Sequence, residues 1–279
     1  MNQPLLKGRN VSAQHANARP GMIGKNYLYL LRFAVLAVLA VLPAAAHAAP
    51  MLIVNHSFED PVIASGTFDT DAAPSGWSAY GGNIDFGLRT IGVLNPNSTT
   101  LYTDPVPDGQ NVGVVFLLDA FSNQTFFANT EAGLQQTLAA TLQTLTQYTL
   151  TVEVGNIAND VNSPHNQFQF GGFPSYRIDL FVGGSVIASD DNTLLPNEGR
   201  FLTSTVAISV GAFHGLAGQN LGIRLVNLNS APGIEVNFDN VRLDATPIPE
   251  PSSLSLFAML AAGLAIGKAR RRRGKQMAE

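Results

Sequence analysis

Residues 148–154 read YTLTVEV, in which apolar and polar side chains alternate without a break. The same alternation returns in residues 176–182, 221–225 and 236–239. Successive side chains of a β-strand point to opposite faces, so each of these runs has one apolar face and one polar face. The pattern therefore predicts half-buried strands rather than helices.

Gly, Pro, Asn and Asp separate these runs, as expected for turns between short strands. Eight or more strands with one apolar face each predict an all-β fold, a two-sheet antiparallel jelly-roll sandwich over residues 49–245. A helix is the alternative for residues 131–145, although their Thr content disfavours it. Further strands are predicted at Met51–Phe58, Asn83–Arg89, Asn111–Leu118, Ser185–Ser189 and Phe201–Val210.

The formal net charge of −4 hides a strong asymmetry along the chain. Residues 49–250 contain nineteen Asp or Glu, five Arg and no Lys, a balance of −14, whereas both ends are basic. An acidic domain repels phosphate backbones, so we expect no nucleic-acid partner. The acidity instead suits either a cation such as calcium or simple solubility.

The chain has no cysteine, which excludes disulfides, thiolate zinc sites and a Cys nucleophile. The histidines between residues 49 and 250 stand alone, and no metal-binding His-Glu-x-x-His or Gly-x-Ser-x-Gly elbow occurs. These observations favour a non-enzymatic protein without excluding an enzyme.

The N-terminal residues 1–48 have the organisation of a secretory signal peptide with a long basic beginning. Lys25 precedes the apolar run 28–42, and Arg32 lies near the start of this run. Pro43 ends the run, and the small residues at 46 and 48 are typical of a signal peptidase cleavage site. We therefore expect export, with signal peptidase as a partner.

The C-terminal residues 246–279 contain an uncharged apolar segment, 252–267, followed by the basic segment 268–275. This pattern predicts one transmembrane helix with its basic end in the cytoplasm and the acidic domain outside.

The order of motifs in this tail resembles the PEP-CTERM sorting signal of Gram-negative bacteria. The resemblance rests on a Pro-Glu-Pro motif, an apolar segment and an arginine run: Pro249, Glu250, Pro251, Arg270, Arg271, Arg272 and Arg273. It implies recognition by an exosortase. It also implies a membrane-anchored intermediate, then a cell-surface or extracellular location, often beside exopolysaccharide.

Three short motifs of the middle section resemble galactose-binding-like jelly rolls, which include many carbohydrate-binding modules. They are the NHSFE of residues 55–59, the PSGW of residues 74–77 and the FDNV of residues 238–241. The resemblance implies a structural calcium ion between the first and last strands, with Glu59, Asp239 and Asn55 as ligands. Calcium prefers such oxygen donors; the alternative is that Glu59 caps a turn and Asp239 forms an ordinary hydrogen bond.

Sugar binding needs aromatic rings beside polar side chains. The candidate ligand-binding residues are Trp77, Tyr80, Asn83, Asp85, Arg89 and Tyr102. The alternative for Trp77 is a place in the core. The polar loop 159–173 contains Phe168, Phe170 and Phe173, and it is either a second binding loop or a surface excursion.

Three functions remain open from the sequence. The first is an exported envelope or extracellular-matrix protein whose jelly roll binds carbohydrate. The second is a structural surface or biofilm protein without a small ligand. The third is a calcium-dependent jelly-roll lyase or cyclase, which a buried Asp or Glu with a raised pKa beside Trp77 or Tyr102 would favour.

Overall fold

The computed structural model describes residues 47–81, 89–97, 100–118, 131–159, 168, 170–230 and 232–249, together with 263, 266 and 267. Residues 45–250 form one compact unit. Residues 1–46 of the predicted signal peptide lie outside the described residues, and so does the sorting tail from Glu250 onward apart from those last three residues. In the part of the chain that is described, no helix has the length and apolarity needed to cross a membrane.

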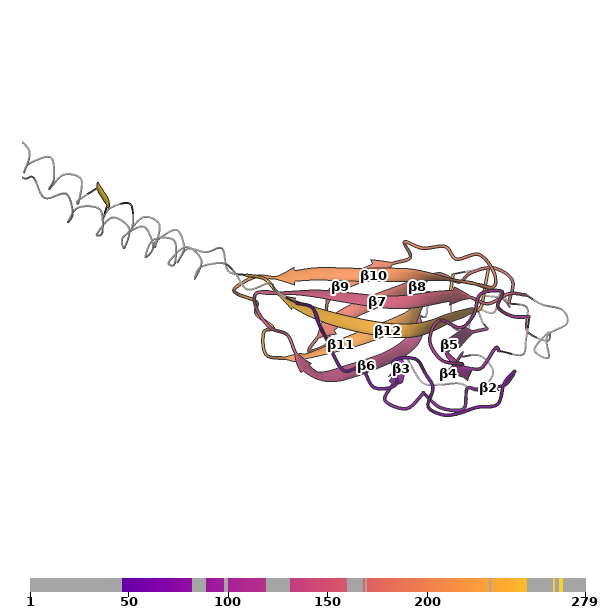
Figure 1. Cartoon of the computed structure of the whole chain (residues 1–279). Coiled ribbons are helices and arrows are strands. Elements are labelled where there is room, and N and C mark those ends of the chain that lie inside the picture. The colour runs from indigo at the N-terminus through magenta and orange to yellow at the C-terminus, as the bar shows by residue number, and fades with distance from the viewer. Residues whose placement is uncertain are drawn as a thin grey trace, which may run out of the picture. The chain divides into compact units, whose positions relative to one another are not determined.

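The described part of this unit is built from twelve strands (Figure 1). They are β1 (Ala49–Pro50), β2 (Phe68–Asp69), β3 (Ser78–Tyr80), β4 (Arg89–Leu94), β5 (Val112–Leu117), β6 (Ala132–Thr141), β7 (Thr146–Asn156), β8 (Tyr176–Val182), β9 (Ser185–Asp191), β10 (Arg200–Val210), β11 (Asn220–Asn227) and β12 (Glu235–Pro247).

The strands form two antiparallel sheets. The larger sheet has the order β10-β7-β12-β5-β4-β2, with β1 paired to β12, and the smaller has the order β3-β6-β11-β8-β9. The prediction of an all-β fold with two antiparallel sheets is therefore confirmed. β7 and β12 lie inside the larger sheet, so both edges of each strand pair with a neighbouring strand.

The main core lies between the two sheets. The apolar residues of the alternating runs supply it: Tyr148, Leu150, Val152 and Val154 from β7, Tyr176, Ile178, Leu180 and Val182 from β8, and Leu221, Ile223 and Leu225 from β11. All are at most 1% exposed. At about 25 cal/mol per Å² of apolar surface removed from water, this burial is the main stabilising contribution to the fold.

Two predicted elements differ in the structure. Residues 131–145 contain strand β6 and no helix, because Leu134 and Leu138 face the core from a strand paired along β11. Met51–Phe58 is not a strand, since Asn55 and Phe58 have φ angles of 51° and 59°, which break an extended conformation.

The remaining strand predictions agree where they can be compared. Asn111–Leu118 contains β5, Ser185–Ser189 lies within β9, and Phe201–Val210 lies within β10. Of the predicted strand Asn83–Arg89, residues 83–88 lie outside the described residues, and Arg89 begins β4.

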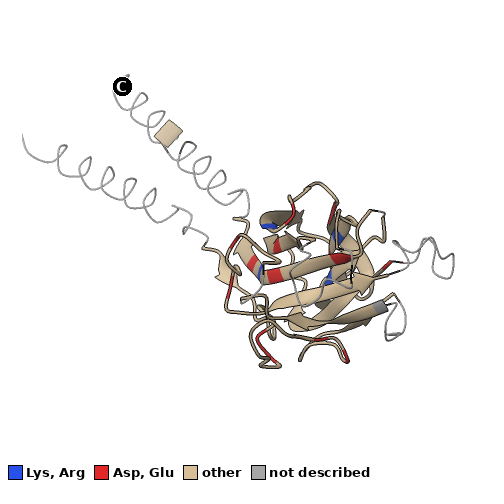
Figure 2. Ribbon diagram, turned by 90° about the vertical axis from the view of Figure 1, so that its right-hand side faces the viewer, with Lys and Arg blue, Asp and Glu red and all other residues tan. Residues whose placement is uncertain are grey.

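A second apolar cluster covers the outer face of the larger sheet. Leu94 of β4 and Val112, Val114 and Phe116 of β5 pack there against Leu101, Ile157, Phe170 and Ile234 from the connecting segments. The described acidic residues are spread over strands and loops of the sandwich (Figure 2). The negative charge of the sandwich is therefore not concentrated in one region of the fold.

Candidate active site

A cavity of about 240 Å³ opens within the second apolar cluster. Its walls are mostly apolar and aromatic, and they come from β2, β4, β5, β12 and the connecting segments. The lining residues are Phe68, Thr70, Asp71, Thr90, Leu94, Leu101, Val114, Phe116, Ile157, Phe168, Phe170 and Glu235. Mostly apolar walls with a few polar groups are typical of a small-molecule site.

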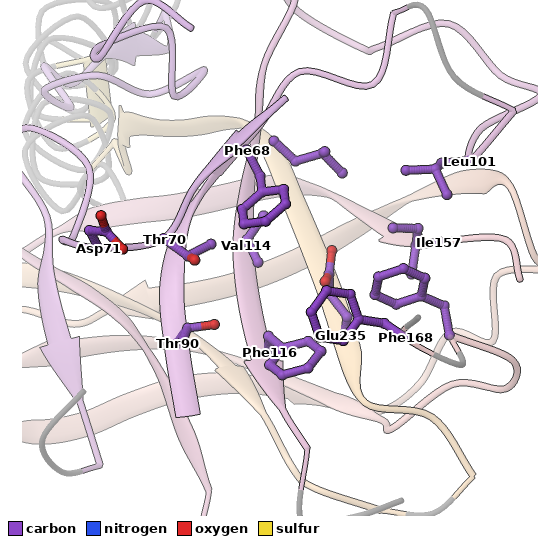
Figure 3. Close-up of a pocket in the computed structure, with 12 residues that line it drawn as sticks. Phe68, Thr70, Asp71, Thr90, Leu101, Val114, Phe116, Ile157, Phe168 and Glu235 are labelled. Carbon is purple, nitrogen blue, oxygen red and sulfur yellow. The ribbon is translucent and has the colours of Figure 1, made fainter. Parts of the chain in front are cut away.

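Glu235 is the first residue of β12, and its side chain points into the space near Phe68, Phe116 and Phe168 (Figure 3). It lies on the face of β12 opposite to Val236, which packs into the main core. The Phe168 ring lies edge-on to Phe116, at 5.3 Å between centroids. The carboxyl group therefore lies among aromatic rings in the cavity.

Burial sets the protonation of this carboxyl group. Glu235 is 6% exposed, and loss of hydration raises its pKa to about 7, while a hydrogen bond from Asn237 acts in the opposite direction. A carboxyl with this pKa is neutral in a substantial fraction of molecules near neutral pH. It can donate a proton there, which an ordinary Glu cannot.

A short chain of hydrogen bonds leads away from Glu235. Asn237 donates its side-chain amide to Glu235 Oε1 at 2.9 Å, and its own Oδ1 accepts the hydroxyl proton of Tyr102. The Tyr102 ring stacks on Phe201 with 4.4 Å between centroids. Burial, followed by the nearby Glu235, raises the pKa of Tyr102 well above its ordinary value. The phenol is therefore a neutral donor at physiological pH.

The structure places the predicted ligand-binding residues in different environments. Trp77 is 7% exposed in the main core, where its ring packs on Phe58 and its Nε1 donates to the Asn55 carbonyl. Tyr80 lies on the smaller sheet, under the Arg224 guanidinium and hydrogen-bonded to Glu131. Neither ring lines the cavity.

Of the other candidates, Tyr102 belongs to the second apolar cluster and reaches Glu235 through Asn237. Asn83 and Asp85 lie outside the described residues, and only the strand position of Arg89 is defined. The loop 159–173 contributes Phe168 and Phe170 to the cavity, whereas Phe173 packs into the main core.

The predicted calcium ligands Glu59 and Asp239 hold the same loop. Glu59 Oε1 accepts the backbone amides of Gln110 and Asn111 at 2.7 and 2.8 Å. Asp239 Oδ2 accepts the Asp108 amide at 2.8 Å. Both carboxylates therefore cap residues 108–111.

Asn55, the third predicted ligand, has other partners. Its side chain donates to the carbonyls of Asp60 and Ser75 and accepts the Asp60 amide. Within the described residues, no three His, Asp or Glu side chains gather in a geometry that could hold a metal ion.

Sequence reasoning did not identify Glu235 or Asn237 as site residues. Their alternation with Val236 and Phe238 predicts a solvent-facing polar side of β12. The structure buries that side beneath the second apolar cluster, so Asn237 is 0% exposed. The aromatic spacing in 159–173 was the available signal that a loop covers this face.

Fold and site together define a jelly-roll protein with a buried, protonatable carboxyl in an aromatic cavity. Residues 49–244 match the model of the HpiC1-like family, described as HpiC1 cyclase, and the chain belongs to this family. Residues 247–273 match the PEP-CTERM protein-sorting motif, which marks a secreted, exosortase-processed protein destined for the cell surface. No curated protein matches the chain.

Solved structures of cyclases are similar to this chain. The Stig cyclase Fisc from Fischerella sp. TAU, in complex with (3Z)-3-(1-methyl-2-pyrrolidinylidene)-3H-indole, is 34% identical; the match covers 73% of this chain and 100% of that one, with a TM-score of 0.64. A cyclase from Fischerella sp. TAU in complex with 4-(1H-indol-3-yl)butan-2-one is 35% identical over 72% and 100% of the two chains, with a TM-score of 0.63.

A xylan-binding domain of Paenibacillus barcinonensis Xyn10C is also similar, at 13% identity and a TM-score of 0.39 over 74% of this chain and 99% of that one. The prediction of carbohydrate binding stays a prediction.

Proposed function

We propose that the protein is a cyclase that takes a small, unsaturated aromatic substrate into the cavity and donates a proton to it from Glu235. The observation that carries the proposal is the Glu235 carboxyl, buried among Phe68, Phe116 and Phe168, with a pKa of about 7. Membership of the cyclase family supports the same conclusion.

The proposed reaction is an isomerisation that needs no cofactor. The O–H bond of neutral Glu235 breaks and its proton adds to a double bond of the substrate, which leaves a cation. A second double bond of the same molecule attacks the cation and closes a ring. Loss of a proton to the Glu235 carboxylate then restores the acid. The surrounding aromatic rings exclude water that would otherwise capture the cation.

An indole compound suits this cavity. The two Fischerella cyclase complexes contain an indole derivative. The cavity walls of Leu94, Val114 and Phe116 can pack on a flat bicyclic ring, and Thr90 adds a polar group. We therefore expect an indole with an unsaturated side chain as substrate.

Binding and turnover test the proposal separately. Calorimetry with 4-(1H-indol-3-yl)butan-2-one should show binding to the wild type. A panel of 3-alkenylindoles, followed by mass spectrometry, should give a product with the substrate's mass and a new retention time. Glu235→Gln should bind the ketone but lose turnover by about 10²- to 10⁴-fold, the usual contribution of a general acid.

Glu153→Gln is the matched control, because Glu153 on β7 is hydrogen-bonded to Thr203 and does not line the cavity. This variant should turn over as the wild type does. The proposal fails if no indole compound binds, or if Glu235→Gln converts the substrate at the wild-type rate.

Calcium binding is a second proposal, for the loop 108–111. Burial, together with the neighbouring charges of Asp108 and Glu59, raises the pKa of Asp239 to about 8, although two backbone hydrogen bonds act in the opposite direction. A cation would relieve this repulsion. Adding millimolar calcium after EGTA should then raise the Tm, since calcium at 100 times its Kd contributes about 2.7 kcal/mol. An unchanged Tm would contradict it.

The proposed route to the cell surface includes a membrane-anchored intermediate. Apolar residues 252–267 and the basic residues 268–275 are its physical basis. Signal peptidase and exopolysaccharide remain proposed partners. Pulse labelling followed by cell fractionation would detect a transient membrane-bound form of higher mass.

A further inference from the structure

Three contacts determine how the buried amide of Asn237 is oriented. Its Nδ2 donates to the Gly113 carbonyl at 3.3 Å and to Glu235 Oε1 at 2.9 Å, and its Oδ1 faces the Tyr102 hydroxyl. A backbone carbonyl can only accept, so Gly113 requires the NH₂ group on its side. The other end of the amide is then the oxygen, and Tyr102 must be the donor.

This orientation has a consequence for Glu235. Nδ2 has two hydrogens, and Gly113 takes one while Glu235 Oε1 takes the other. Because Oε1 accepts this hydrogen bond, the acid hydrogen of neutral Glu235 belongs on Oε2. Without the amide, the hydrogen could reside on either oxygen and the carboxyl could rotate.

We infer that Asn237 is a positioning residue of the cavity: with Gly113 and Tyr102 it fixes which oxygen of Glu235 carries the transferable proton. The inference rests on the proposed role of Glu235 as proton donor. Asn237 and Tyr102 do not line the cavity, so they act through Glu235. The contacts of Asn237 with the Gly113 carbonyl and the Tyr102 hydroxyl thus make the two oxygens of Glu235 unequal, and the proton is donated from Oε2.

The amide also adjusts the acidity of Glu235. A hydrogen bond to Oε1 stabilises the carboxylate, so it opposes the effect of burial on the pKa. Within the described residues, the other titratable group that interacts with Glu235 is the neutral Tyr102 phenol. Removing the amide should therefore raise the pKa of Glu235.

Infrared titration of the full protein tests this inference without any substrate. The carbonyl band of the neutral Glu235 carboxyl is identified as the band that Glu235→Gln lacks, and its loss with rising pH gives a midpoint. Asn237→Leu has a similar volume but no amide, and it should raise that midpoint by about one pH unit. Tyr102→Phe keeps the ring on Phe201 and should raise it by less.

Thr90→Val is the matched control. It removes a polar group from the same cavity, and Thr90 does not contribute to the pKa shift of Glu235. Its midpoint should equal that of the wild type. If Asn237→Leu does not fold, the Tyr102→Phe shift decides the question by itself.

The possible failures are distinguishable. If the wild type shows no band that Glu235→Gln removes, the neutral carboxyl is absent and the proposed function fails. If the band titrates near pH 7 in the wild type but at the same midpoint in Asn237→Leu and Tyr102→Phe, the carboxyl exists and the positioning role of Asn237 is overturned.

Discussion

Glu235 links the chemistry of the cavity to the stability of the sandwich. The folded protein retains its proton up to a pH of about 7, whereas the unfolded chain releases it near the ordinary value of 4.5. The folded state thus binds more protons between these values. Its stabilising contribution is fully present below pH 4.5 and is lost as the pH rises toward 7.

We therefore predict that Glu235→Gln flattens the pH dependence of stability. A shift of about 2.5 units corresponds to about 3 kcal/mol. Relative to the wild type, the variant should therefore become more stable by up to this amount as the pH rises from about 4 to about 8. Urea denaturation at several pH values measures the difference.

Asp239 also makes the protein less stable as the pH rises, because its pKa is raised in the folded state. The wild type and Glu235→Gln both contain Asp239, so its effect cancels when their stabilities are compared. Glu153→Gln should give a curve parallel to that of the wild type. Parallel curves for Glu235→Gln as well would mean that Glu235 is ionised in the folded protein.

The site could be predicted from the sequence only in part. Tyr102 was a candidate binding residue, and the phenylalanines of loop 159–173 marked a possible binding loop, because a small-molecule site combines aromatic rings with polar side chains. Glu235 was not a candidate, since a polar residue in an alternating strand ordinarily faces water. Whether a second layer covers that face depends on segments far away in the sequence.

At the scale of elements, the segment before β2 shows how a side chain can replace a strand partner. Gln136 of β6 accepts the Val54 amide through Oε1 and donates to the Val54 carbonyl through Nε2, both at 2.9 Å. Gln136 is 5% exposed. The Gln136 amide therefore supplies hydrogen-bond partners to both backbone groups of Val54, in the segment 51–58 whose φ angles prevent a regular strand.

Gln136→Leu removes both hydrogen bonds and leaves two backbone groups of Val54 without these partners. We predict a loss of about 1–2 kcal/mol of stability, because each hydrogen bond contributes about 0.5–1.5 kcal/mol net and water can reach Val54, which is 51% exposed. Thr137→Val, at the adjacent exposed position, should change stability by less than about 0.5 kcal/mol. Equal effects of the two variants in urea denaturation would contradict this account.

The strands were the most predictable part of the fold. Residues 148–154, 176–182 and 221–225 have apolar side chains at every second position over a sufficient length, and each run lies within a strand of the structure. Residues 131–145 were ambiguous because Leu134 and Leu138 are spaced four apart, which suits one face of a helix as well as one face of a strand. Pairing with β11 decided the outcome.

At the scale of the whole molecule, the chain joins a cyclase-family sandwich to a PEP-CTERM sorting motif. The two regions have opposite charge: the sandwich is acidic and the end of the tail is basic. Basic residues beside an apolar segment remain in the cytoplasm during insertion. The charge distribution is therefore suited to delivering the sandwich outside, where a substrate would have to reach the cavity.

Replacement of Pro249, Glu250 and Pro251 by alanine tests the sorting motif. In a bacterium with an exosortase, the unprocessed chain should keep its apolar segment and accumulate in the membrane fraction, whereas the wild type should reach the cell surface or medium. Immunoblotting of fractions with an antibody to the sandwich measures this. Changing Arg270–Arg273 to lysine retains the charge, so this control should be sorted normally. Release of the alanine variant at the wild-type level would show that delivery does not depend on the motif.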